Sequence, residues 1–321
     1  MITIPVFPEK IAEFPELTIP HKFYIADNQI FIENYPNVYI YTLSPFKLMN
    51  KIGSAGEGPK EFKNALRIFL TDDYLAVWSH GKISYYTKKG KYLKERRILH
   101  SPGNVYKILA DNFVSYSHLR DKGILYTTVR LSDSNFKTIK EIYRDEAWYS
   151  ASKPKNAYGH NLHLLCRVAH NRIFLSNRDG EILIFDKAGT LIRKIEHKFD
   201  TVKVTEDEKQ AYKKWFKEGR TFKEVYHRLK HLLVYPSTYP PIRHIYVADN
   251  KIYIMTFKKI AGKTEFVIFD FEGKVLKKAM LPLQYTNIEE FYWYTFKDDK
   301  FYNMVENEDT EEWELHVHDI K

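Results

Sequence analysis

A two-residue turn that recurs along the chain constrains its fold more than any other feature. Six copies begin at positions 27, 72, 111, 170, 249 and 298, with Asp at five of them and His at one. In the two most similar copies, residues 21–32 and 243–254, an Asp-Asn pair separates two apolar, β-rich runs. Asp and Asn tolerate the positive φ angles of tight hairpin turns. The repeat therefore predicts six hairpins, each joining the first two strands of a unit.

A second hairpin follows the first within the repeated unit. Residues 181–192 and 265–276 share an apolar run, an Asp and a turn Gly, and weaker versions occur at 83–93 and 38–45. Four strands in each of six units predict an all-β, six-bladed β-propeller of four-stranded antiparallel blades. An open stack or sandwich of hairpins is the alternative, and the near-constant repeat argues against it.

The sixth unit ends after its third strand, at residues 315–321. The apolar segment 1–7 is expected to supply the missing fourth strand and to close the ring, which removes an exposed sheet edge. The sequence thus predicts a single domain over residues 1–321.

The links between units are unequal, and the longest, residues 201–241, has a helical pattern. Thr205 and Glu208 form a capping box, and aromatic residues follow it at helical spacing. A second capping pattern occupies residues 221–224. We therefore expect a helical hairpin over residues 205–233, inserted between blades 4 and 5, with its aromatic side packed on the propeller.

The charge balance favours anionic partners. The chain carries 50 Lys and Arg against 41 Asp and Glu, a formal charge of +9, and a positive field attracts anions. The outer side of the expected hairpin is basic, and its candidate ligand-binding residues are Lys213, Lys217 and Arg220. One interpretation is a lid or docking surface for a protein or an anionic small molecule; the other is a solvated face.

A second set of candidates lies where the first strand of each unit begins. One equivalent position holds a basic or aromatic residue in five units, and a further arginine, Arg243, precedes it in the fifth. These residues are Lys22, Arg67, Tyr106, His244 and Trp293. A ring of such groups at the channel would suit an anion or a sugar. The alternative is that the aromatic side chains pack between blades and the cations lie at the rim.

Histidines are the weak candidates for a metal site. His227 and His231 are four residues apart on an expected helix, so they share a face. Zinc needs a further ligand, for which His160 and His163 on the same side of the propeller are candidates. Ordinary packed or exposed histidines are the alternative. The sequence predicts no cofactor and no catalytic residue, and its single cysteine, Cys166, is expected to be a buried apolar residue.

Residues 51–62 resemble a G-x-G-P-x-E-F segment found in six-bladed propellers of the NHL/TolB-like class. Residues 235–241 also resemble that class. The resemblance spans nearly the whole chain and implies the same fold, in a class whose members are often exported. Where related propellers act as lactonases or lyases, acidic or His metal ligands surround the channel, and no such set can be matched in this sequence.

These observations predict a non-enzymatic binding or scaffold propeller that uses the face carrying the helical hairpin. The alternative is a propeller enzyme, a metal-assisted hydrolase or lyase, with its site at the channel mouth. Nucleic acid is an unlikely partner, because the lysines are scattered. The sequence has neither a run of about 20 apolar residues nor a signal peptide. A cytoplasmic protein is expected, or an exported one if Met1 replaces a removed signal; the sequence does not predict an oligomeric state.

Overall fold

The computed structural model divides by its contacts into two compact units, which are described separately. Unit 1 comprises Met1–Ser101 and Phe291–Lys321, and unit 2 comprises Pro102–Glu290. The structure describes residues 9–63, 66–71, 73–79, 81–98, 105–109, 112–147, 154–159, 165–177, 180–219, 222–224, 226–283 and 293–320, with backbone only at 105–109 and 159.

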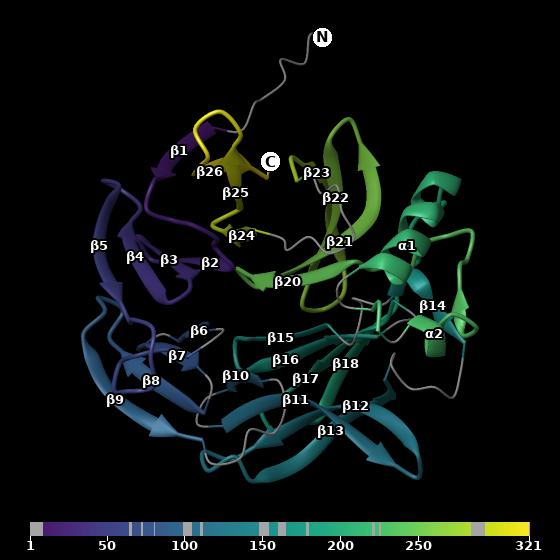
Figure 1. The fold of residues 1–321 in the computed structure, drawn as a ribbon, viewed down its shortest axis with the longest axis horizontal. Coiled ribbons are helices and arrows are strands. Elements are labelled where there is room, and N and C mark those ends of the chain that lie inside the picture. Colours follow the sequence, from purple (N-terminus) through teal and green to yellow (C-terminus); the bar gives the residue numbers. More distant parts are fainter. Residues whose placement is uncertain are drawn as a thin grey trace. The chain divides into compact units, whose positions relative to one another are not determined.

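The described strands of unit 1 form three four-stranded antiparallel sheets (Figure 1). The first contains β2 (Lys22–Ala26), β3 (Gln29–Asn34), β4 (Asn37–Thr42) and β5 (Lys47–Ile52). The second contains β6 (Leu66–Leu70), β7 (Leu75–Ser79), β8 (Lys82–Tyr86) and β9 (Tyr92–Arg97). The third has the order β24 (Tyr294–Lys297), β25 (Lys300–Asn307), β26 (Glu312–Asp319) and β1 (Glu9–Phe14).

The described part of unit 2 also has three four-stranded antiparallel sheets. They are β10 (Val105–Leu109), β11 (Asn112–Asp121), β12 (Ile124–Ser132) and β13 (Thr138–Glu146); β15 (Leu165–Ala169), β16 (Arg172–Ser176), β17 (Ile182–Phe185) and β18 (Leu191–Ile195); and β20 (His244–Ala248), β21 (Lys251–Ile260), β22 (Lys263–Asp270) and β23 (Val275–Leu281). The unit also contains helices α1 (Glu206–Glu218) and α2 (Tyr226–Leu229), the 3-10 turn Ala157–Gly159, and a two-stranded parallel ladder of β14 (Lys155–Asn156) and β19 (Leu233–Val234).

The predicted hairpin turns are confirmed where the structure describes them. Both turn residues have positive φ at residues 170–171, 249–250 and 298–299, with values from 48° to 56°, as tight hairpins require. Asp27 has φ 54°. The copies that begin at 72 and 111 lie outside the described residues.

Burial follows strand position within each sheet. Most second and third strands bury successive side chains and therefore both faces; in β3, for example, Ile30, Phe31 and Ile32 are completely buried. Five of the fourth strands, β5, β9, β13, β18 and β23, carry at least two Lys or Arg; in β18, Arg193 and Lys194 face solvent. Charged side chains on an edge strand disfavour pairing with another chain.

Neighbouring sheets within a unit pack face to face through apolar clusters. In unit 1, one cluster joins the sheet of β24–β26 to that of β2–β5, and another joins the latter to β6–β9. In unit 2, similar clusters lie between the sheets of β10–β13 and β15–β18, and between the latter and β20–β23. The first strands also adjoin: β2 lies beside β24, and β15 beside β10 and β20. Six such blades define an all-β, six-bladed β-propeller.

The fourth strand of the β24–β26 blade comes from the beginning of the described chain, but later than predicted. Strand β1 pairs antiparallel with β26, from Glu9 opposite Val317 to Phe14 opposite Trp313. It is this segment that buries Ala12 and Phe14 against the blade. The proposed segment 1–7 lies outside the described residues, and closure of the ring stays a prediction.

The Gly-rich link that carries the family resemblance is a tightly folded connector. The Phe62 N–H donates to the Ser54 carbonyl at 2.7 Å, and the completely buried Phe62 ring packs against Gly53. Gly53 has φ 91°, and a Cβ there would lie 2.1 Å from that ring. Glycine is therefore required at this position for both conformation and space.

The segment between β18 and β20 differs from the predicted pair of helices. Helix α1 begins after Thr205 with the expected capping box, in which the Glu208 N–H donates to Thr205 Oγ1 and the Glu208 carboxylate accepts from the Thr205 N–H. The second helix is the single turn α2. It ends early because the chain enters β19, whose Leu233 pairs with Lys155.

Candidate functional site

A groove of about 480 Å³ lies on the surface of the helical segment. Most of its wall comes from one face of α1, whose residues recur three and four positions apart. The rest comes from α2, the loop after α2 and the segment after β19. The lining residues are Gln210, Lys213, Lys214, Lys217, Glu218, Tyr226, Lys230 and Tyr235. We call this feature the lysine groove.

The residues that line the lysine groove have a net positive charge. It contains four lysines and one glutamate. Within the described part of the chain, ion pairs are formed by the neighbouring Lys209, with Glu206 at 3.6 Å, but by none of the four groove lysines. Lys213 and Lys217 are four residues apart on one helix, where like charges repel. An anion bound in the groove would remove this repulsion.

Two tyrosines give the groove an aromatic wall. The Lys213 ammonium lies 5.7 Å from the centre of the Tyr235 ring, which is within cation–π range. Burial raises the pKa of Tyr235 to about 12, with smaller contributions from Tyr226 and Tyr158. Tyr235 therefore stays a neutral phenol, and the groove offers ring faces as well as ammonium groups.

An aromatic core beneath the groove holds it in place. Tyr158, Tyr212, Phe216, Phe222 and Leu229 are buried together and support both helices. The Tyr158 and Tyr212 ring centres are 4.8 Å apart in an edge-to-face arrangement, which is a favourable aromatic geometry.

Two polar features tie the helical segment to the rest of unit 2. The ladder of β14 and β19 connects it to the chain that follows β13, whereas the β-bridge between Lys203 and Thr238 joins the two ends of the segment itself. The Lys155 side chain is 99% buried, and its ammonium lies 3.2 Å from the Glu146 carboxylate. Because removing one partner of a buried ion pair is costly, this pair fixes the base of the segment.

Of the residues predicted on the helical segment, Lys213 and Lys217 line the groove, whereas Arg220 lies outside the described residues. Sequence reasoning did not assign Tyr235 to the site. Its proximity depends on the chain returning through β19, which the local sequence pattern does not show.

The strand-start candidates of unit 1 are held mainly by structural contacts. Lys22 is exposed at the beginning of β2. The Arg67 guanidinium lies 3.6 Å from a carboxylate oxygen of Glu33 and donates to the Leu66 carbonyl. The Trp293 indole N–H donates to the Pro20 carbonyl at 2.6 Å, so this N–H already has a protein acceptor.

The two described strand-start candidates of unit 2, Arg243 and His244, make different contacts. Arg243 is 91% buried, and its guanidinium lies 4.9 Å from the centre of the Phe257 ring. His244 begins β20 and contacts the Arg167 guanidinium of β15 through Nε2. The side chain of Tyr106 lies outside the described residues.

A buried carboxylate between two blades of unit 1 escaped the sequence analysis. Glu33 on β3 is completely buried, and its Oε1 accepts a hydrogen bond from the Ile68 N–H of β6 at 2.8 Å. Among the described residues its Oε2 has no hydrogen-bond partner, and the Arg67 guanidinium lies 3.6 Å from it. Burial raises the pKa of Glu33 to about 6, against the opposing effects of Lys22 and Arg67. A glutamate that ends an apolar run was the signal for this site.

The structure gives no support to a metal site within its described residues. His227 and His231 are both exposed, and no described group of three His, Cys, Asp or Glu side chains is suited to hold a metal ion. His160 and His163 lie outside the described residues. Cys166 is half-buried, with its thiol free. Among the described helices, none has the length and apolar character needed to cross a bilayer.

Comparisons with known proteins concern the fold. No family model matches the sequence, and no curated protein matches it. Among solved structures, a member of the DUF4221 family from Bacteroides vulgatus has 10% identity and a TM-score of 0.49, over 97% of this chain and 99% of that one. Chaetomium thermophilum Raptor has 11% identity and a TM-score of 0.46, over 96% and 29%. BamB from Moraxella catarrhalis has 10% identity and a TM-score of 0.32, over 92% and 71%.

Proposed function

We propose that this propeller is a binding protein and that its lysine groove takes an anionic group of a protein or small molecule. One observation carries the proposal: four lysines without ion pairs in the described part of the chain line a single groove with two tyrosines. Lysine is a compact point charge with three donors, which suits carboxylate or phosphate oxygens approaching from several directions.

The groove is also organised before a ligand arrives. The capping box fixes the beginning of α1, and the aromatic core fixes the side of α1 opposite to solvent. A site whose backbone is already ordered loses less conformational entropy on binding. The same rigid scaffold would therefore present the lysines in one arrangement to any anionic partner.

A binding assay with a labelled peptide of eight glutamates tests the proposal. We expect fluorescence anisotropy to show binding that weakens steeply as salt rises, because the Debye length falls from about 10 Å at 0.1 M to about 3 Å at 1 M. The double variant Lys213→Gln/Lys217→Gln should weaken binding about tenfold or more, since two charge contacts are removed.

The matched control makes the same change of charge elsewhere in unit 2. Lys187 and Lys274 are exposed in hairpin turns of two blades, and the variant Lys187→Gln/Lys274→Gln should bind the peptide like the wild type. Equal loss in both double variants would mean that only the net charge matters. The proposal for the groove would then be wrong.

The finer structural predictions belong to the same proposal. We propose that β1 closes the ring of blades and that the helical segment is the docking face. Membership of the NHL/TolB-like class, to which the link at 51–62 points, likewise remains a prediction.

A further inference from the structure

The hairpin of β25 and β26 ends in an acidic tip, which is unusual in a chain with a formal charge of +9. No Lys or Arg occurs between Lys300 and Lys321. The tip carries five acidic residues, Glu306, Glu308, Asp309, Glu311 and Glu312. All but Glu312, which is half-buried, are exposed. We call residues 305–312 the acidic tip.

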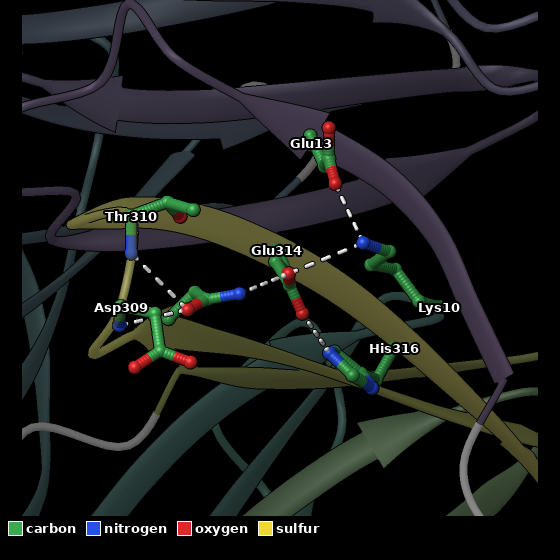
Figure 2. A network of polar contacts seen from close by, with 7 residues as sticks. Lys10, Glu13, Asp309, Thr310, Glu314 and His316 are labelled. Atoms are coloured by element: carbon green, nitrogen blue, oxygen red, sulfur yellow. Dashed lines mark hydrogen bonds and ion pairs between the residues drawn. The ribbon is translucent and has the colours of Figure 1, made fainter.

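The acidic tip has a fixed conformation. The Asn307 side-chain oxygen accepts hydrogen bonds from the Asp309 N–H at 2.9 Å and the Thr310 N–H at 3.3 Å. The Glu311 N–H donates to the Asn307 carbonyl at 2.8 Å. The Asn307 amide also donates to Glu314 at 2.8 Å, which anchors the turn to β26 (Figure 2).

The nearby cationic side chains contact Glu314 rather than the acidic tip. Glu314 lies 3.3 Å from the Lys10 ammonium and accepts from His316 Nε2 at 2.8 Å (Figure 2). In contrast, none of the five acidic side chains of the tip forms an ion pair within the described part of the chain. Next to them, Val305 is 42% exposed, so the tip combines free carboxylates with an apolar contact.

The tip and the lysine groove are complementary in composition and scale. Four lysines and two tyrosines line the groove, and five carboxylates and Val305 form the tip. Lys213 and Lys217 are about 6 Å apart along the axis of α1. The four-residue turn keeps the Cα atoms of Glu308 and Glu311 within about 7 Å of each other. The two glutamates and the two lysines are thus attached to backbone positions of similar spacing.

We infer that the acidic tip of one copy of this chain docks in the lysine groove of a second copy. This inference rests on the proposed function, because it assigns a partner to the same groove. The contact is heterologous, since it joins two different surfaces, and it produces closed rings, reciprocal dimers or open chains according to the rotation between copies. Charge complementarity of this kind sets specificity and association rate and weakens with salt.

Sedimentation velocity on the full chain is the first test. We expect the wild type to associate as its concentration rises at about 0.05 M salt, and to sediment as a monomer at about 0.5 M, where charges are strongly screened. A wild type that remains monomeric under both conditions would overturn the inference.

Charge reversal supplies a control within the same protein. The groove variant Lys213→Glu/Lys217→Glu changes the groove charge from +3 to −1, so that it repels the acidic tip. The tip variant Glu308→Lys/Glu311→Lys lowers the tip charge from −5 to −1, which removes most of the attraction. Each variant should stay monomeric alone at concentrations at which the wild type associates. An equal mixture of the two should associate again, since the unchanged acidic tip of the groove variant can dock in the unchanged lysine groove of the tip variant. Reversed variants that still associate alone, or a mixture that stays monomeric, would contradict the inference.

Two further arms keep the outcomes distinct. Far-UV circular dichroism checks that each charge-reversed variant is folded. A variant that does not fold is replaced by its neutral counterpart, Lys213→Gln/Lys217→Gln or Glu308→Gln/Glu311→Gln. Each neutral variant should weaken association about tenfold or more. If the wild type is monomeric but its groove binds the octa-glutamate peptide, this inference fails and the proposed function stands. If the groove does not bind that peptide, the proposed function fails as well.

Discussion

Replacing Glu33 with glutamine should change the pH dependence of stability without removing the contact between its two blades. Glu33 is completely buried, and one of its oxygens accepts the Ile68 N–H. A glutamine carbonyl can accept the same hydrogen bond but cannot ionise. The variant Glu33→Gln therefore isolates the effect of the buried charge.

The magnitude follows from the raised pKa. Burial moves the pKa of Glu33 from 4.5 to about 6, and a difference of about 1.5 units corresponds to about 2 kcal/mol at 1.36 kcal/mol per unit. The folded protein binds this proton more tightly than the unfolded chain does. Its contribution to stability is therefore fully present below pH 4.5 and is lost as the pH rises through about 6.

Urea unfolding at pH 4.5 and pH 7.5 measures the effect. The quantity to compare is the unfolding free energy of Glu33→Gln minus that of the wild type. This difference should be about 2 kcal/mol larger at the higher pH than at the lower one. The exposed variant Glu272→Gln, outside the acidic tip and the lysine groove, is the control and should show no such change. A difference between Glu33→Gln and the wild type that is the same at both pH values would refute the reasoning.

Two further predictions concern the stability of helix α1 and of the Gly-rich link at residues 51–62. Thr205→Ala should lower the unfolding free energy by about 1 kcal/mol, because α1 loses its N-cap; thermal unfolding with Thr205→Ser as the conservative control measures this. Gly53→Ala should lower it by more than Gly81→Ala does: both residues have positive φ, but an added Cβ meets the Phe62 ring only at Gly53, and open space at Gly81. Equal losses in the two glycine variants would contradict the role of that contact.

The blades could be predicted from the sequence because their signals are local. An Asp-Asn pair between apolar runs specifies a hairpin whatever surrounds it, and the turn at 249–250 has the positive φ angles that it implies. The fourth strand beside β26 was placed too early, since apolar character alone does not distinguish residues 1–7 from Glu9–Phe14. That pairing joins segments about 300 residues apart, and no local pattern encodes its register.

The candidate site was only partly predictable for the same reason. Lys213 and Lys217 were found because helical spacing places them on one exposed face of α1. Tyr235 joins them only after the chain has returned through β19, and the buried state of Glu33 depends on β6 packing beside β3. The run of acids at 306–312 was visible in the sequence, but its fixed shape depends on the hydrogen bonds of Asn307.

Lysine acetylation footprinting by mass spectrometry tests the central claim most directly. The reagent modifies exposed amines, and a bound anion protects those that it contacts. With the octa-glutamate peptide present, we predict slower modification of Lys213, Lys217 and Lys230, and unchanged modification of Lys187 and Lys274. Equal protection of all five lysines, or protection of none, would contradict the assignment of the groove as the binding site.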